Sequence, residues 1–428
     1  MARGSSELLT SDARRILTAQ AARAFAYGFT AVLLGSTLEA RGWSPARVGA
    51  LLATIVIGTA LVSLVIGRFG NRLGRRPLYL ILYLGLAACG LVFAFAEAFW
   101  ILALAGLTGT MSPEVVESGP FTSLEQSMLP SAGKTDRRTR IFGTYNATAT
   151  IAGSMGALAA GLPALLRRSW SGVPADHWFF LLLVPAGLLG AWLARSLSQA
   201  VEEGGGGQAA PPLGRSRRRV IGLAGLFALD SFAGGFVLQA FIVYWLRLRF
   251  GASLESLAVI LFAVGLLQAA SFVLATRVAE RVGLLNTMVF THLPSNILLA
   301  AIPLASNLPV AAALLFARSA LSQMDVPTRQ AYVVALVDPD ERTAAAAYTN
   351  TARYAARPLG PALAGAVQEV AMGMPFFIAG AVKSVYDLAL YLWFRRVPLA
   401  TTHAALTGPT AGADIPGEET EQGRHSDE

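Results

Sequence analysis

Four ionisable residues lie deep inside long apolar segments of this sequence, namely Arg23, Glu114, Asp230 and Arg318. A charged group within a bilayer is costly, so such residues face the protein interior or a watery cavity and commonly bind ions, carry protons or contact ligands. Glu114 follows Trp100 by about 14 residues, or roughly 20 Å along a helix at 1.5 Å per residue. We therefore expect Glu114 and Arg318 to lie near the membrane midplane and to be the leading functional candidates.

The segments that must position these groups are unusually apolar. Of 428 residues, 54% are hydrophobic and 14% charged, against about 25% charged in soluble domains, and the mean hydropathy is +0.54. This composition excludes a disordered protein, a nucleic-acid module and an ordinary cytosolic enzyme. Cys89 is the single cysteine and the four histidines show no metal-ligand spacing, so neither a disulfide nor a metal nor another cofactor is expected.

Twelve apolar segments predict twelve transmembrane helices in an all-α membrane protein. They are residues 17–38, 48–67, 77–96, 100–126, 141–166, 178–198, 220–246, 254–276, 284–304, 309–336, 343–369 and 374–394. Alternate loops are rich in Lys and Arg, which places those loops and both termini in the cytoplasm and the protein in the cell membrane. The net charge of +8 fits this loop bias better than a nucleic-acid partner.

The chain divides into two halves that resemble each other. We expect a six-helix bundle over 1–198, a Gly-rich cytoplasmic linker over 199–219, a second bundle over 220–396 and a disordered tail over 397–428. A shift of about 204 residues superposes polar positions: Gln126, Thr139 and Asn146 fall on Gln330, Thr343 and Asn350. A repeat in the same orientation predicts two pseudo-symmetric bundles related by an axis along the membrane normal.

Three pairs of equivalent positions carry opposite charges. These pairs are Arg23 with Asp230, Glu114 with Arg318, and Glu125 with Arg329. Such residues could pair across the two bundles or share a polar cavity. Alternatively, each charge is neutralised locally, because Asp325 and Arg329 are four residues apart, as are Lys383 and Asp387, and can meet on one helix face. Structural latches are predicted nearer the cytoplasmic ends of the helices. They are Glu125, Arg329, Arg353 and Arg357.

The loop after the second apolar segment carries a motif. It reads Gly67-x-x-x-Asn71-Arg72-x-Gly74-Arg75-Arg76. This resembles the signature Gly-x-x-x-Asp-Arg-x-Gly-Arg-Arg of the major facilitator superfamily, with Asn71 in place of Asp. With the repeat and the linker, the resemblance covers nearly the whole chain and implies the alternating-access fold and secondary transport. We expect this loop to tie the two bundles together at their cytoplasmic face.

The resemblance implies transport of a small molecule across the lipid bilayer by a monomer. Aromatic residues in the first and seventh segments favour efflux of an amphipathic compound, with Tyr27 and Gln239 as polar cavity candidates and Asp325 as a further one. Proton coupling through Glu114 or Asp230 is predicted, because the sequence has no phosphate-binding loop for ATP. The alternatives are an importer of a sugar, organic acid or metal chelate, and a non-transporting receptor or assembly factor.

Overall fold

A computed structural model describes residues 10–114, 119–129, 135–203, 213–338 and 341–397. The regular secondary structure of these residues is helical. The first half contains α1 (Ser11–Ala40), α2 (Pro45–Leu73), α3 (Arg75–Phe95), α4 (Phe99–Leu107), α5 (Pro120–Met128), α6 (Thr135–Ala159), α7 (Leu162–Ser169), the 3₁₀ helix η2 (Asp176–Leu182), α8 (Leu183–Arg195) and α9 (Ala200–Glu203). The predicted all-α architecture is confirmed.

The second half repeats this order of long and broken helices. It contains α10 (Arg217–Gly235), α11 (Gln239–Phe250), α12 (Leu254–Val282), α13 (Leu284–Ala301), the 3₁₀ helix η3 (Ile302–Leu304), α14 (Leu308–Ser322), α15 (Asp325–Leu336), α16 (Arg342–Ala356), α17 (Leu359–Val370) and α18 (Met374–Phe394). The predicted tail from 398 onward and the middle of the predicted linker, 204–212, lie outside the described residues.

Nine helical stretches of the described chain are long and apolar enough to cross a membrane. The other three of the twelve expected passages are α4 with α5, α14 with α15, and α16 with α17, each divided by a break. Proline lies at or near each break, where its missing N–H and ring disfavour a continuous helix. The broken passages therefore explain why a length criterion finds fewer spans than the sequence pattern predicts.

Local signals set the helix boundaries, and they recur in both halves. Ser44 caps α2 by accepting a hydrogen bond from the Arg47 N–H, and Ser253 caps α12 in the same way from the Ser256 N–H. Gly74, between α2 and α3, has φ +82°, and Gly283, between α12 and α13, has φ +86°. Both turns require a positive φ, which glycine adopts without a Cβ clash.

Close helix contacts also repeat between the halves. A Cβ on Gly156 would lie 1.9 Å from the carbonyl oxygen of Phe25, and a Cβ on Gly360 would lie 2.5 Å from that of Phe232. Both distances are far inside van der Waals contact, so α6 approaches α1, and α17 approaches α10, only because these residues are glycine. The same contact at equivalent positions supports the repeat predicted from the sequence.

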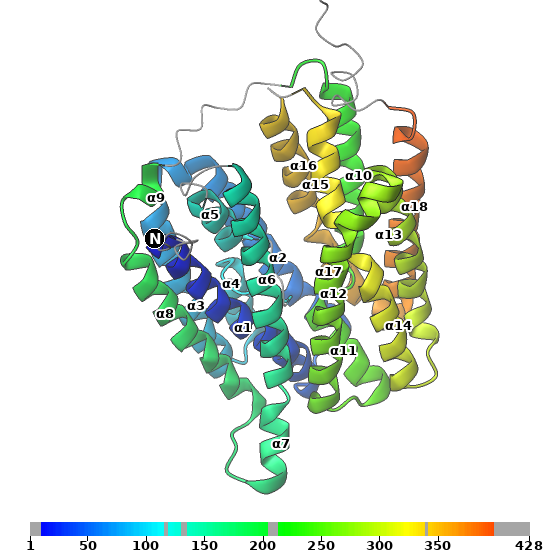
Figure 1. Cartoon of the computed structure of the whole chain (residues 1–428). Coiled ribbons are helices and arrows are strands. Elements are labelled where there is room, and N and C mark those ends of the chain that lie inside the picture. Colours follow the sequence, from blue (N-terminus) through cyan, green and yellow to red (C-terminus); the bar gives the residue numbers. More distant parts are fainter. Residues whose placement is uncertain (1–9, 115–118, 130–134, 204–212, 339–340, 398–428) are drawn as a thin grey trace, which may run out of the picture.

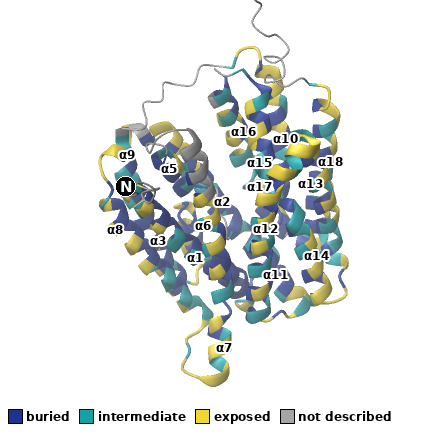
Figure 2. Ribbon diagram, viewed as in Figure 1, coloured by how far each residue is buried: buried dark blue, intermediate teal, exposed yellow. Residues whose placement is uncertain are grey.

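Large apolar side chains cover the outside of the helices. Figure 2 shows many exposed residues on the outer faces, and Trp100, at 80% exposure, and Leu104, at 70%, are among the most exposed. Isolated exposed apolar residues are normal in soluble proteins, but many large apolar side chains on the same outer faces indicate a surface that contacts apolar surroundings rather than water. These faces are suited to contact lipid.

The two halves meet firmly at one end of the molecule. Figure 1 shows their ribbons together at the end opposite α9 and the start of α10, and apart at the end where α9 and the start of α10 lie. We call these the closed end and the linker end. At the closed end Arg247 Nε lies 2.7 Å from Glu39 Oε2, and the Tyr244 hydroxyl donates to the Trp43 carbonyl over 2.8 Å. A Cβ on Gly49 would lie 2.3 Å from the Pro361 carbonyl oxygen, so backbones from the two halves touch there.

Candidate functional site

Glu114 lies in the break between α4 and α5, outside any helix. Gly109, with φ +66°, begins the break, and its Cα approaches the α2 backbone so closely that a Cβ would lie 2.6 Å from the Gly58 carbonyl oxygen. Ser112 Oγ accepts a hydrogen bond from the Glu114 N–H over 3.2 Å. Glu114 is therefore outside α4 and α5, and the described residues divide the predicted segment 100–126 into two helices.

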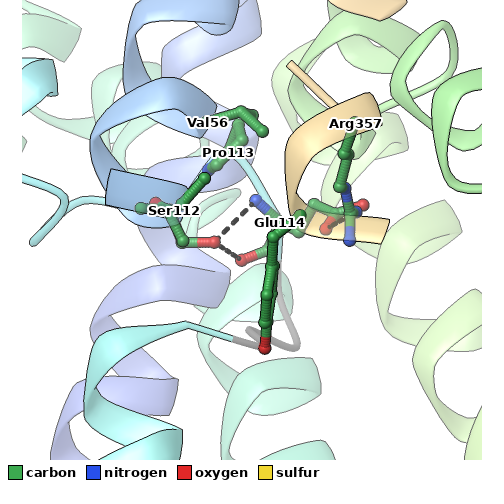
Figure 3. A pocket seen from close by; sticks show the side chains of 8 residues that line it. Val56, Ser112, Pro113, Glu114 and Arg357 are labelled. Atoms are coloured by element: carbon green, nitrogen blue, oxygen red, sulfur yellow. Dashed lines mark hydrogen bonds and ion pairs between the residues drawn. The ribbon is translucent and has the colours of Figure 1, made fainter. Parts of the chain in front are cut away.

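This break brings Glu114 against the second half. The Arg357 guanidinium and the Glu114 carboxylate form an ion pair, and both side chains are about one quarter exposed, at 23% and 24%. Figure 3 shows the two side chains converging from the break and from the α16–α17 junction. The neighbouring Pro113 carbonyl accepts a hydrogen bond from the Ala240 N–H at the start of α11 over 3.0 Å. Polar contacts thus connect the halves near the centre of the molecule.

A central cavity of about 360 Å³ lies beside this ion pair. It extends from the α10–α11 break at Gln239 to Gln126, in the last turns of α5 near the linker end. Its lining includes the charged or titratable residues Glu114, Asp230, His292, Arg318, Asp325, Arg329, Arg353, Arg357 and Lys383. Its volume falls within the range of small-molecule sites.

Eight of the eleven site residues predicted outside the loop motif line this cavity. They are Glu114, Asp230, Gln239, Arg318, Asp325, Arg329, Arg353 and Arg357. Arg353 and Arg357, predicted as latches nearer the ends, thus lie with the midplane candidates, because α16 stops in the middle of the passage. The lining does not include Arg23, Tyr27 or Glu125. The Tyr27 hydroxyl instead donates to the Thr110 carbonyl in the α4–α5 break.

The aromatic residues predicted to form an amphipathic cavity lie elsewhere. Phe29 packs on Phe179, and Phe236 packs on Phe232, with ring centroids 6.2 and 5.2 Å apart. Among the described residues around the central cavity, aromatic side chains come from Phe272 and Tyr354 alone, and neither belongs to the predicted set. The physical basis for an apolar, aromatic chamber is therefore removed.

Asp230 is the centre of a buried ion network in the second half. Lys383 Nζ lies 2.5 Å from Asp230 Oδ1, and Arg329 Nη1 lies 3.3 Å from Asp230 Oδ2. Arg329 Nη1 also lies 2.9 Å from Asp325 Oδ2, as their spacing of four residues predicts. Asp230 therefore has two cationic partners on α15 and α18, and all three groups line the cavity.

The first half holds the same ion pair with reversed polarity. Arg23 Nη2 lies 2.7 Å from Glu125 Oε2, with side chains 3% and 0% exposed. The hydroxyls of Tyr79 and Tyr145 each donate to Glu125 over 2.7 Å. The four residues of two equivalent-position pairs thus form ion pairs inside their own half, Arg23 with Glu125 and Asp230 with Arg329. In the third pair, Glu114 forms its ion pair across the halves.

A histidine that the sequence did not single out belongs to the second-half network. His292 Nδ1 lies 2.9 Å from Asp387 Oδ1, and Asn296 Nδ2 donates to Asp387 Oδ2 over 2.8 Å. His292 Nε2 lies 4.0 Å from Asp230 Oδ1 at the cavity. Asp387 therefore pairs with α13, while Lys383 reaches Asp230, and the predicted Lys383–Asp387 pair is wrong. A lone histidine in an apolar segment gave no signal, because its carboxylate partners, Asp230 and Asp387, are 62 and 95 positions away in the chain.

The predicted gating loop makes its described contacts inside the first half. Glu202 on α9 accepts hydrogen bonds from the Arg75 and Arg76 N–H groups over 2.7 and 2.8 Å, at the start of α3. The Arg75 guanidinium donates to the carbonyls of Ser127 and Val201 over 3.0 and 3.1 Å. Gly67 and Arg72 lie on α2 and Gly74 directly follows it, whereas of Asn71 only the backbone is described. These contacts bind α3 to α5 and α9, whereas a tie to the second bundle was expected.

Two helical halves around a polar central cavity, with an apolar outer surface, define a solute transporter of the membrane. The sequence matches the family model described as Major Facilitator Superfamily over residues 16–361, and the chain belongs to this superfamily. The protein is therefore a transporter and not an enzyme.

Proteins similar to this chain fit the assignment. It is 24% identical over 412 residues to the uncharacterized membrane protein YJR124C of Saccharomyces cerevisiae, covering 88% of this chain and 92% of the yeast protein. Among solved structures, the nucleoside transporter NupG matches with a TM-score of 0.70 and 15% identity, over 90% of this chain and all of NupG. The inward-open xylose transporter XylE from E. coli matches with a TM-score of 0.68 and 14% identity, over 90% of this chain and 97% of XylE. The human organic anion transporter MFSD10 matches with a TM-score of 0.60 and 18% identity, over 89% of this chain and all of MFSD10. At such identities these structures support the fold alone.

Proposed function

We propose that this protein is a secondary transporter that carries a small polar solute through the central cavity by alternating access, with protons as the coupling ion. The observation that carries the proposal is the charged lining of the cavity at the interface of the two halves. An interior site of about 360 Å³ suits a small molecule with several polar groups. The earlier preference for an amphipathic solute rested on aromatic walls, which the lining does not supply, and efflux lost its main support with it.

Alternating access requires contacts that open at one end while others form at the opposite end. The candidate gate at the closed end consists of the Glu39–Arg247 ion pair and the Tyr244–Trp43 hydrogen bond. The ion pair joins α1 to α11 and the hydrogen bond joins the α1–α2 connection to α11, so rocking one half against the other would separate both contacts together. The central Glu114–Arg357 pair lies between the gate and the linker end. If the linker end is cytoplasmic, as the Lys and Arg distribution predicts, this conformation faces inward.

Proton coupling is assigned to Asp230 and its partners. Asp230 lies between two cations at the cavity wall, where water and solute reach it in one conformation. Protonation of Asp230 would release Lys383 and change the charge seen by the solute. An ionisable residue inside a membrane segment commonly serves such a proton relay. This supports Asp230 over Glu114 as the coupling carboxylate, because Glu114 is committed to the contact between the halves.

The first experiment is a screen of solutes that stabilise the purified protein, followed by flux into proteoliposomes. Sugars, nucleosides and organic anions, the solutes named for the similar structures, form the starting panel. Flux of a stabilising solute should follow an imposed pH gradient, and its direction under a fixed gradient separates import from export. Absence of flux for every stabilising solute would favour a receptor or assembly role and overturn the proposal.

The coupling assignment is tested by Asp230→Asn in the same vesicles. We expect pH-driven flux to fall at least tenfold while exchange of solute without a gradient is less affected. Glu280→Gln, on the exposed linker-end turn of α12, is the matched control and should behave as wild type. Full pH-driven flux in Asp230→Asn would exclude Asp230.

A further inference from the structure

Two arginines of the central cavity have no carboxylate partner among the described residues. Each cavity carboxylate is already in an ion pair with a cation of the same lining: Glu114 with Arg357, Asp230 with Lys383 and Arg329, and Asp325 with Arg329. Arg318 on α14 and Arg353 on α16 form no ion pair in the described part of the chain, yet both line the cavity. Within the described residues, Asp230 and Asp325 attract both arginines electrostatically, but neither arginine has a carboxylate in direct contact.

The surroundings of these two arginines raise the free-energy cost of keeping them charged. The Nε atoms of Arg318 and Arg353 are both buried without a hydrogen-bond partner within the described structure. Arg353 also lies close enough to Arg329 and Arg357 to be repelled by them. A desolvated cation without a counter-charge destabilises the fold unless a ligand supplies the charge.

The charge balance of the whole lining gives the same result. Among the described residues around the cavity, five Lys and Arg side chains face three carboxylates, which leaves an excess of two positive charges with His292 neutral. The two cations without a partner equal this excess. The described part of the lining therefore carries an excess of positive charge, which a solute with two negative charges would balance.

We propose that Arg318 and Arg353 form an anion-binding subsite, and that the transported solute carries carboxylate or phosphate groups with a total charge near −2. This inference rests on the proposed function, because it assumes that the central cavity is the transport site. The guanidinium group presents a planar fork of N–H donors that matches the two oxygens of a carboxylate or phosphate. Arg318 and Arg353 project from α14 and α16, so one small dianion would connect both helices.

The test is the thermal unfolding of the purified full-length protein with defined solutes at constant ionic strength. The panel is succinate for carboxylates, inorganic phosphate and glycerol 3-phosphate for phosphates, and xylose and uridine as neutral probes. We expect at least one anion to raise the melting temperature with concentration, as ligand binding to the folded state requires. The succinate and phosphate arms distinguish the two anion chemistries. Stabilisation by a neutral probe alone would overturn the subsite.

Substitution then locates the binding. Arg318→Gln and Arg353→Gln should each weaken binding of the stabilising anion at least tenfold, or about 1.4 kcal/mol. Arg281→Gln, at the exposed linker-end turn of α12, is the matched control and should leave the affinity unchanged. Unchanged affinity in both cavity variants would overturn the proposal.

A second measurement needs no bound solute. Because neither arginine has an ion-pair partner in the described structure, Arg318→Gln and Arg353→Gln should unfold at the same or a higher temperature than wild type when no solute is added. A loss of stability well beyond that of Arg281→Gln would show that the arginines hold the fold, and would overturn the subsite even if no panel anion binds. If a neutral solute is transported and the two arginine variants transport it as wild type does, the proposed transport stands and the anion subsite is refuted. If an anion binds but is not transported, transport alone is refuted.

Discussion

The two halves place an ion pair at equivalent positions, yet the surroundings give the pairs different properties. In the first half Arg23 and Glu125 are sealed, and Tyr79 and Tyr145 complete the hydrogen bonds of the carboxylate. In the second half Asp230 and Arg329 lie at the cavity wall, where Asp230 also binds Lys383. The reversed polarity indicates that the position requires a neutral pair but does not specify which helix carries which charge.

The difference teaches where function resides in a duplicated fold. A buried carboxylate with all its oxygens satisfied has no reason to change partners, so the pair in the first half acts as a structural link between α1 and α5. A carboxylate shared by two cations beside a cavity can exchange partners with small cost. Most charged residues of the described cavity lining come from α10, α14, α15, α16 and α18, so under the proposed function the second half would bind the solute and the first half would supply the opposing wall.

Breaking the sealed pair should have the largest effect on stability. Glu125→Gln leaves Arg23 charged, buried and without a counter-charge, which costs about 3–5 kcal/mol in buried pairs. The free energy of unfolding, measured by denaturant in detergent, should fall by that amount, with loss of expression as the extreme. Arg23→Gln combined with Glu125→Gln removes both charges and should recover much of the loss. A single variant as stable as wild type would show that this pair is not structural.

Breaking the cavity pair should cost less stability and more transport. In Asp230→Asn, Arg329 keeps Asp325 and Lys383 faces the cavity, so we expect a loss of about 1–3 kcal/mol, the cost of one unsatisfied buried polar group. The same denaturant assay checks this value alongside the flux measurement. A loss equal to that of Glu125→Gln would erase the distinction between the two halves.

The linker end offers a smaller, pH-dependent comparison outside the membrane spans. Glu341 accepts hydrogen bonds from the Ser216 hydroxyl and from the Gly214 and Ser216 N–H groups, and these hold the pKa of its carboxyl below the ordinary value. A lowered pKa in the folded state stabilises the protein above the unfolded-state value of about 4.3, and this stabilisation is lost as the pH falls through the folded-state pKa.

Glu341→Gln should therefore destabilise by about 1 kcal/mol at pH 7, as loss of a helix-capping group does. The difference from wild type should stay constant between about pH 6 and 8 and shrink below about pH 4. Thermal unfolding across this pH series measures it. Glu280→Gln, which carries its carboxylate on an exposed turn, serves as control, and a pH-independent difference would contradict the role of the carboxylate.

The weakest single effect is expected at the closed end. The Glu39–Arg247 pair is about one quarter exposed, and such pairs contribute about 0.2–1 kcal/mol. Glu39→Gln should shift the conformational equilibrium by at most about fivefold toward the state open at that end. The introduced cysteine of Gln126→Cys, on the cavity wall near the linker end, should react more slowly with a thiol reagent in this variant. Cys89 is buried and should contribute little background labelling. Unchanged labelling would exclude this pair as part of the gate.

Much of the architecture follows from the sequence because it depends on local chemistry. Runs of apolar residues predicted the helices, and Gly74 and Gly283 marked two equivalent turns that need a positive φ. The sequence also identified the charged residues of the described cavity lining, except His292, since charges inside apolar segments must avoid lipid. The pairing partners were harder to predict: Glu114 meets Arg357, 243 positions later, and helical spacing cannot indicate a contact of that kind.

By itself, the sequence determined that the chain is an all-helical membrane protein and which residues are disfavoured in lipid, and it predicted where the two halves divide, because hydrophobic free energy and loop charge depend on local composition. The tertiary structure alone decided which charges share a cavity. Arg23 and Asp230 occupy equivalent positions, but α3 and α6 cover one with tyrosines while the other is left at the cavity wall. Solvent access and counter-charges are properties of the packing of distant helices, and they separate a structural ion pair from a functional one.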